Sequence, residues 1–264
     1  MSDWLGAICE VDGIDMHYTR TGGSKPPVIL LHGLAADGLT WTSLARALEK
    51  EYDVIMPDAR GHGKSSAPDH GYRYEDHARD AVGIIRALDL ARPVLIGHSM
   101  GGMTAAMVAG RNPALLRGLV LADPSFLTLE RQGELRDGDA AVRHGRTLNL
   151  SFDQVLADLR SRHRDRLPET LELLAKARLQ ANVRAFDVLA PPSPDYQRLV
   201  GMIEVPSQLI IADSGVVTET VAEELTRINP RFQVRQIPNA GHGLHYDQPE
   251  SFATIVKSFL RSIV

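Results

Sequence analysis

Residues 93–102 read PVLIGHSMGG, an apolar run that ends in a glycine-rich turn around a single serine. The residues that follow have apolar side chains at helical spacing as far as Asn112-Pro113, which stops the pattern. A tight turn from a strand into a helix strains the backbone of its central residue and points that side chain away from the sheet. The flanking glycines let strand and helix approach closely. The G-x-S-x-G spacing in this context indicates that Ser99 is a nucleophile.

This turn has two other interpretations besides that of a nucleophile. A phosphate-binding loop would need the pattern G-x-x-x-x-G-K-[ST], which is absent here, and no basic side chain follows the glycines. An ordinary glycine-rich turn without chemistry is the remaining alternative.

Short apolar runs alternate with segments of helical spacing along most of the chain. The runs lack the polar–apolar alternation of half-exposed strands, as expected for parallel strands covered on both faces. They predict an α/β fold with a mostly parallel eight-stranded sheet flanked by helices. Two further runs flank Val11-Asp12-Gly13 and predict an antiparallel hairpin at the sheet edge. The other expected strands are residues 28–32, 53–58, 93–98, 118–123, 208–213 and 232–238, and the expected helices are residues 40–51, 74–90 and 218–229.

Residues 125–204 break this alternation. The segment is rich in Leu, Arg, Asp and Glu at helical spacing, and it ends in the rigid turn APPSPDY. It is longer than the usual connection between parallel strands. We therefore expect a core of residues 1–124 and 205–264, with a helical cap inserted as residues 125–204. An insertion at the carboxyl ends of parallel strands would cover the crevice where such sheets bind ligands.

The composition argues against several classes of function. The chain has 264 residues, of which 44% are hydrophobic and 23% charged, and its formal net charge of -4 gives no basic footprint for nucleic acid. No apolar stretch approaches the ~20 residues of a membrane-spanning helix, and the first residues lack the pattern of a signal peptide. The single cysteine, Cys9, excludes an internal disulfide and a CxxC metal site. We expect a cytoplasmic protein that binds neither nucleic acid nor membrane.

A serine hydroxyl needs a base, and the chain offers ten histidines. His242 lies between the last expected strand and a terminal helix that begins near Pro249, which places it at the same sheet edge as Ser99. His245 is the main competitor and more readily lines the pocket or caps the helix. His98 lies inside the turn and faces elsewhere. We therefore predict His242 as the base.

Four motifs resemble those of the α/β-hydrolase family: LLHGLAADGLTW (30–41), PDARGHGKS (57–65), GHSMGG (97–102) and GHGLHYDQPESF (241–252). The resemblance covers almost the whole chain and leaves only the expected cap without a recognisable motif. It implies the family fold, with nucleophile, acid and histidine in that chain order. It also implies an oxyanion hole built from the backbone N–H groups of Leu34 and Met100.

The same resemblance implies a set of residues that border the substrate. For His32-Gly33 the alternative is a turn without a ligand role, and for Trp41 it is packing in the core. The residues expected near the substrate are His32, Gly33, Trp41, His98 and His245.

The acid that orients the histidine has two candidates. Most α/β-hydrolases carry it a few residues past the penultimate strand, but there the sequence reads LIIADSGVVTET, with Asp213 directly at the strand end. A subset of the family places the acid one strand earlier, where LVLADPSF contains Asp123. We favour Asp123 and keep Asp213 as the alternative.

Other polar clusters have simpler interpretations. Asp58, Arg60 and His62 lie in a loop that this fold uses structurally, so we expect them to form turns and hydrogen bonds. The arginines of RSRHRDR (160–166) are most simply a solvated helix face, and the alternative is a site for an acidic group of the substrate.

Together these features predict a serine hydrolase that needs no metal or cofactor. Its expected substrates are esters or lactones of small to medium apolar molecules, because the motifs do not indicate a peptide-binding cleft. The alternatives are cleavage of amides or of C–C bonds by the same triad, a perhydrolase or cofactor-free oxygenase, and a ligand receptor with slow or no turnover. The sequence does not predict the oligomeric state.

Overall fold

The strands form a single sheet with one antiparallel edge. In the computed structural model, which describes residues 4–263, this sheet has eight strands in the order β1-β2-β4-β3-β5-β6-β7-β8. The first two strands form the predicted hairpin, the second is antiparallel to the fourth, and the remaining neighbours are parallel. The predicted fold class is confirmed. The strands are β1 (Leu5–Val11), β2 (Ile14–Arg20), β3 (Pro27–Leu31), β4 (Asp53–Pro57), β5 (Val94–His98), β6 (Gly118–Ala122), β7 (Ser207–Ser214) and β8 (Phe232–Gly241).

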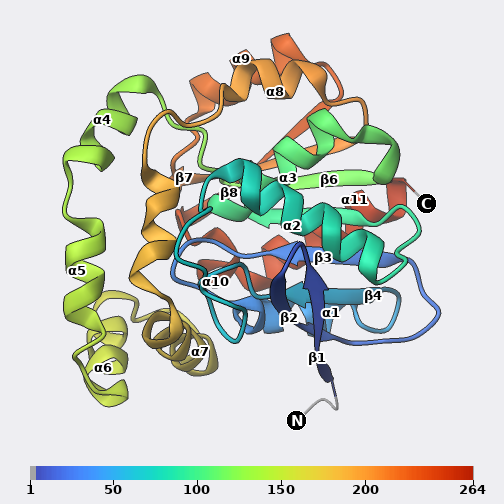
Figure 1. The fold of residues 1–264 in the computed structure, drawn as a ribbon. Coiled ribbons are helices and arrows are strands. Elements are labelled where there is room, and N and C mark those ends of the chain that lie inside the picture. The colour runs from blue at the N-terminus through green and yellow to red at the C-terminus, as the bar shows by residue number, and fades with distance from the viewer. Residues whose placement is uncertain (1–3, 264) are drawn as a thin grey trace.

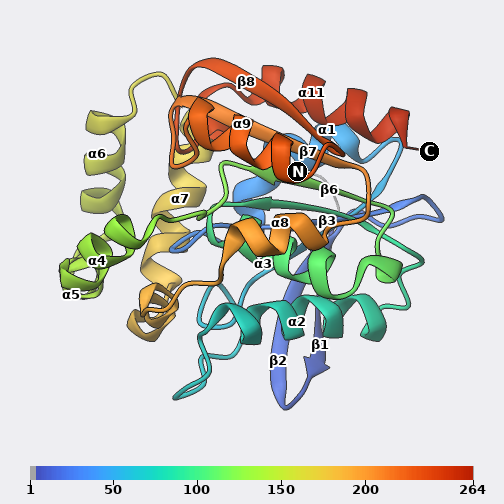
Figure 2. The same ribbon diagram turned by 90° about the horizontal axis from the view of Figure 1, so that it is seen from above.

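Helices cover both faces of this sheet (Figure 1 and Figure 2). They include α1 (Thr42–Leu48), α2 (Tyr74–Ala87), α3 (Met100–Arg111), α8 (Tyr196–Met202), α9 (Glu219–Ile228), α10 (Leu244–Asp247) and α11 (Pro249–Ser262), with short 3-10 turns η1 (Gly38–Trp41) and η2 (Pro113–Leu115). The helices α2, α3, α8 and α9 bury their apolar sides in one core, and α1 and α11 bury theirs in another. None of the helices within residues 4–263 combines the length and apolar character that crossing a bilayer requires.

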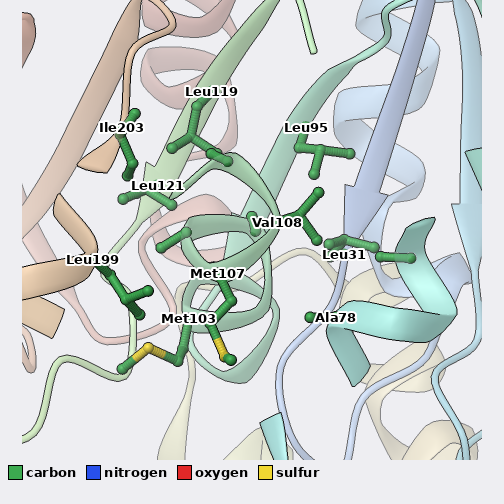
Figure 3. Close-up of a cluster of buried hydrophobic side chains, with 14 of the residues drawn as sticks. Leu31, Ala78, Leu95, Met103, Met107, Val108, Leu119, Leu121, Leu199 and Ile203 are labelled. Atoms are coloured by element: carbon green, nitrogen blue, oxygen red, sulfur yellow. The ribbon is translucent and has the colours of Figure 1, made fainter. Parts of the chain in front are cut away.

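Each central strand contributes to both cores, because neighbouring side chains of a strand point to opposite faces. Leu95 and Leu119 belong to the core that Met107 and Val108 of α3 enter, as Figure 3 shows. Ile96 and Val120 belong to the core that α1 and α11 cover. This burial on both faces explains why the strands are apolar without alternation.

The connection from β6 to β7 carries most of the remaining helices. They are α4 (Leu129–Asp137), α5 (Ala140–Thr147), α6 (Phe152–Arg162), α7 (Pro168–Gln180) and the 3-10 helix η3 (Val183–Leu189), followed by α8. Figures 1 and 2 show α4 to α7 gathered at one end of the sheet. The helices α6 and α7 share a small core that includes Leu159 and Leu171 and is completed by Tyr246. The last helix, α8, packs against α3 and α9. The division into core and cap at residues 125 and 204 stays a prediction.

Candidate active site

Ser99 lies at the junction between β5 and α3. Its backbone has φ 52° and ψ −116°, a left-handed conformation that non-glycine residues rarely adopt. The glycines around it permit this turn. A Cβ atom on Gly97 would lie 2.2 Å from the carbonyl oxygen of Gly101, and one on Gly101 would lie 2.2 Å from that of Leu31. The G-x-S-x-G spacing is therefore a steric requirement of the turn that presents Ser99.

His242 follows β8 and connects Ser99 to Asp123. Its Nε2 lies 2.9 Å from the hydroxyl oxygen of Ser99, and its Nδ1 lies 2.6 Å from Oδ2 of Asp123. An imidazole that donates from Nδ1 to a carboxylate presents an unprotonated Nε2 to the hydroxyl. The three side chains thus stand in the arrangement of a nucleophile, a base and an acid.

Asp123 is fully buried and follows β6 directly. Its carboxylate accepts hydrogen bonds from the backbone N–H groups of Val216 and Val217, at 2.8 to 3.0 Å. Such bonds compensate the cost of removing a charged carboxylate from water. Asp213, the alternative candidate, is exposed and instead accepts from Asn239 N and from Nε2 of Gln236. The structure therefore brings Asp123 to His242 and leaves Asp213 elsewhere.

The predicted oxyanion hole consists of the backbone N–H groups of Leu34 and Met100. Met100 is the first residue of α3, so its N–H has no partner within the helix. Among residues 4–263, neither of these two N–H groups has a hydrogen-bond acceptor. Leu34 lines the cavity beside Ser99. Both N–H groups are thus free to donate, and their role as an oxyanion hole stays a prediction.

Two buried histidines hold the loop that contains Leu34. Nε2 of His32 accepts from Ala59 N at 2.9 Å, and Nε2 of His62 accepts from Ala35 N at 3.1 Å. Burial lowers the pKa of both rings, which keeps each neutral and able to accept. His32 was expected near the substrate, but its ring supports the loop and does not line the cavity beside Ser99.

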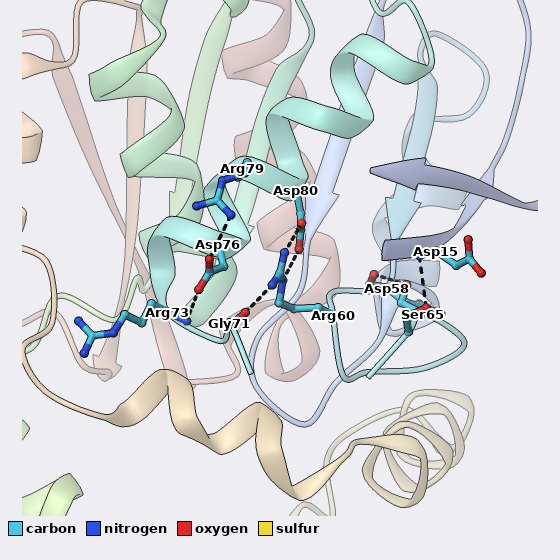
Figure 4. A network of polar contacts seen from close by, with 10 residues as sticks. Asp15, Asp58, Arg60, Ser65, Gly71, Arg73, Asp76, Arg79 and Asp80 are labelled. Atoms are coloured by element: carbon cyan, nitrogen blue, oxygen red, sulfur yellow. Dashed lines mark hydrogen bonds and ion pairs between the residues drawn. The ribbon is translucent and has the colours of Figure 1, made fainter. Parts of the chain in front are cut away.

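The loop after β4 is fixed by a polar network (Figure 4). Arg60 forms a buried, bidentate ion pair with Asp80, with Nε–Oδ2 and Nη2–Oδ1 distances of 2.6 and 2.5 Å. Asp58 accepts from His17 Nδ1 and from the N–H groups of Lys64 and Gly38. Burial alone would raise the pKa of Asp58, but these hydrogen bonds hold that pKa below its usual value. The loop therefore uses its polar residues structurally, as expected.

An aromatic layer lies beneath His242. Nε2 of His98 donates to the carbonyl oxygen of His242 at 2.8 Å, and the His98 ring packs on His245 with 4.5 Å between centroids. Trp41 stacks on the other side of His245 at 4.2 Å and is almost fully buried. Of the residues expected near substrate, Gly33 and His98 line the cavity, whereas Trp41 and His245 pack behind it. Trp41 thus packs in the core, as the alternative interpretation of its motif expects.

Ser99 opens into a cavity of about 540 Å³. One wall comes from the loops around Ser99, Leu34 and His242. The connection between β6 and β7 supplies a second group of lining residues, which are His163, Arg166, Leu174, Arg178 and Phe186. The helices of this connection therefore help to enclose the space in front of the serine.

Comparison with known proteins identifies the family. The sequence model of the family described as "alpha/beta hydrolase fold" matches residues 26–249. The chain belongs to this family. The α/β-hydrolase is 30% identical to N-formylmaleamate deformylase of Pseudomonas putida over 260 residues, which cover 97% of this chain and 96% of the relative. Relatives of this family such as the deformylase are hydrolases, and this chain is likewise a hydrolytic enzyme.

Solved structures share the fold of this α/β-hydrolase along its whole length. That of E-2-(acetamidomethylene)succinate hydrolase has a TM-score of 0.86 at 23% identity and covers 98% of this chain and 99% of that one. That of a thermophilic esterase from Thermogutta terrifontis has a TM-score of 0.79 at 26% identity and covers 99% of both chains.

Sequence reasoning missed two features of the α/β-hydrolase site. The first is Ser125, whose hydroxyl oxygen lies 3.2 Å from that of Ser99. Its position just past Asp123, at the same strand end, could have indicated that it lies near the nucleophile. The second feature is the pair Arg166 and Arg178 on the cavity wall. For Arg166, a site for an acidic group is only the alternative interpretation of RSRHRDR. The other arginines of that stretch are exposed, as the solvated-face interpretation expects. The sequence around Arg178 indicates only a helix and does not predict that this side chain lines the cavity.

Proposed function

We propose that this hydrolase cleaves an ester or lactone of a small to medium molecule through an acyl-enzyme on Ser99. The observation that carries the proposal is the chain of contacts from Ser99 through His242 to Asp123, which opens into a cavity of about 540 Å³. A cavity of this size accommodates a small organic molecule.

The proposed reaction begins when Nε2 of His242 takes the hydroxyl proton of Ser99 as its oxygen attacks the substrate carbonyl. The N–H groups of Leu34 and Met100 then donate to the oxyanion of the tetrahedral intermediate. The protonated His242 returns its proton to the leaving oxygen, and the bond to that oxygen breaks. Water, deprotonated by the same ring, attacks the acyl-enzyme and regenerates Ser99 with release of the carboxylic acid.

Asp123 has a supporting part in this scheme. Its carboxylate fixes the imidazole as the Nδ1–H tautomer and stabilises the positive charge that the ring gains during both steps. The hydrogen bonds from Val216 and Val217 keep the carboxylate in place. We assign the connection of residues 125–204 the role of a cap that shapes the substrate site. Its contribution of one cavity wall supports this role.

A second candidate is cleavage of an acyl–nitrogen bond by the same three residues. The relative from Pseudomonas putida, named as a deformylase of N-formylmaleamate, supports it. The steps are the same, except that His242 gives its proton to a leaving nitrogen, which is a poorer leaving group than an oxygen and depends more strongly on this protonation. Parallel assays with an ester and an amide of the same acyl group would separate the two candidates.

The proposal is tested by labelling with a fluorophosphonate and by hydrolysis of 4-nitrophenyl acetate. We expect the wild type to be labelled and active, and Ser99→Ala to lose both properties. Ser125→Ala is the matched control, because Ser125 is the neighbouring hydroxyl, and it should still be labelled. Equal labelling and turnover in the wild type and Ser99→Ala would overturn the proposal, as would labelling that disappears in Ser125→Ala alone.

A further inference from the structure

Two guanidinium groups line the same cavity as Ser99. Arg166 belongs to the turn between α6 and α7, and its side chain is only 10% exposed. Its Nε donates to Oδ1 of Asp247 at 2.7 Å, and its guanidinium carbon lies 5.3 Å from the ring centre of Tyr246. These contacts fix the group in one orientation. Within residues 4–263 its two terminal nitrogens have no hydrogen-bond acceptor and so remain able to donate.

Arg178 on α7 differs from the other arginines near it. On the surface of this part of the chain, Arg162 pairs with Asp158 at 2.8 Å, and Arg46 pairs with Glu169 at 2.6 Å. Arg178 is partly buried and lines the cavity, yet among the side chains that the structure describes no carboxylate lies within 4.0 Å of it. A guanidinium withdrawn from water is normally paired. Burial lowers the pKa of Arg178, and the charge of Asp158, which already pairs with Arg162, offsets this only in part.

The charges on the cavity wall leave one positive charge unbalanced. The charged side chains that line the cavity are Arg166, Arg178 and Asp247. Both oxygens of Asp247 already accept hydrogen bonds, one from Arg166 and the other from the N–H of Gly241 at 3.0 Å. Burial lowers the pKa of His163, so this neighbouring ring is neutral at pH 7. The site therefore complements a ligand with a single negative charge.

We propose that the substrate cleaved at Ser99 carries a carboxylate, which Arg178 binds together with the free nitrogens of Arg166. This inference rests on the proposed function of Ser99 and adds the chemical class of its substrate. A planar carboxylate matches the fork of an arginine in a bidentate pair, and its single charge matches the wall better than a phosphate dianion does. The anionic substrate that we infer from these arginines differs from the apolar substrate that the sequence predicts.

The test compares esters that differ only in a terminal carboxylate. Mono-4-nitrophenyl esters of the C4, C5 and C6 dicarboxylic acids are paired with 4-nitrophenyl butyrate, valerate and hexanoate, and each rate is corrected for hydrolysis without enzyme. For at least one pair we expect the wild type to favour the carboxylate by about 10–100-fold in kcat/KM, the range of a charged hydrogen bond. In Arg178→Gln this preference should fall towards one, and Arg178→Lys should keep part of it. Arg160→Gln, which changes an exposed arginine of α6, should keep the preference of the wild type.

A binding measurement tests the carboxylate site even if the enzyme does not cleave esters. The monoanions succinamate, glutaramate and adipamate should slow the labelling of Ser99 by a fluorophosphonate in the wild type, and this protection should be lost in Arg178→Gln. Thermal unfolding of each variant checks that the chain still folds. A wild type that is labelled on Ser99 but shows neither carboxylate preference nor protection would overturn the inference while leaving the proposed function intact. Labelling that persists in Ser99→Ala would instead overturn the proposed function.

Discussion

The carboxylate of Asp123 lies 2.6 Å from Nδ1 of His242, although the whole of β7 separates the strands that these residues follow. The contact forms because the loop after β7 donates its N–H groups to Asp123 and supplies no acid of its own to His242. The acid of the proposed triad thus comes from the end of β6, and the next loop serves to hold it.

Asp123→Asn should lower kcat by a factor on the order of 10³–10⁴. The amide oxygen would keep the hydrogen bonds from Val216 and Val217, which turns the NH₂ group towards His242 and forces the ring into the tautomer protonated on Nε2. That ring cannot accept the proton of Ser99. Steady-state hydrolysis of 4-nitrophenyl acetate measures the loss. Asp213→Asn, the control at the exposed alternative position, should change kcat by less than about twofold. A larger loss from Asp213→Asn would reverse the assignment.

Gly215→Ala should reduce kcat by about 10–100-fold, the range of lost hydrogen bonds to a charged group. A Cβ atom on Gly215 would lie 2.6 Å from both carboxylate oxygens of Asp123, so the loop must move and weaken its bonds to that carboxylate. Gly133→Ala is a matched control, because a Cβ atom there meets no other atom within 4 Å. Kinetics and thermal unfolding of both variants test this, and an unchanged kcat in Gly215→Ala would show that the loop is not needed to hold Asp123.

Ser125→Ala should lower kcat by about 2–10-fold, as expected for one neutral hydrogen bond. Ser99 donates its proton to His242 in the proposed reaction, which leaves its oxygen free to accept from the hydroxyl of Ser125 at 3.2 Å. This bond strengthens as Ser99 gains negative charge. Stopped-flow measurement of the acylation step isolates the effect. Faster or unchanged acylation would show that Ser125 does not assist the nucleophile.

Asp37 should make the stability of the fold depend on pH. Burial, with the nearby charge of Asp58, raises the pKa of Asp37 from 3.8 to about 7. The folded state therefore binds this proton more tightly than the unfolded state, so the contribution of Asp37 is complete below pH 4 and is lost as the pH rises to 7. The free energy of unfolding of Asp37→Asn, taken relative to that of the wild type, should therefore be higher at pH 8 than at pH 5. Urea unfolding at both pH values measures this, and an equal difference at the two would contradict it.

The parts of the site that depend on local geometry could be predicted from the sequence. The turn around Ser99 follows from glycine spacing, because any Cβ at positions 97 and 101 would collide with backbone atoms. The alternation of apolar runs likewise predicts the sheet, since its central strands are buried on both faces. These features depend on residues close together in the chain.

Features set by distant contacts were harder to predict. Asp123 and Asp213 both occur at carboxyl ends of neighbouring strands, and only the path of the loop after β7 decides which one faces His242. Arg166 was assigned to a helix face, but α6 ends at Arg162, so the chain turns and directs this arginine to the cavity. Helical periodicity carries no information past the end of its helix.

The most direct test of the central claim is the detection of an acyl group on Ser99 during turnover. A reaction with a 4-nitrophenyl ester, quenched within the first turnover and digested, would be examined by mass spectrometry. The account predicts that the peptide containing Ser99 gains the mass of the acyl group, and that Ser99→Ala forms no adduct. Rapid turnover with the acyl group on another residue, or with full activity in Ser99→Ala, would contradict it.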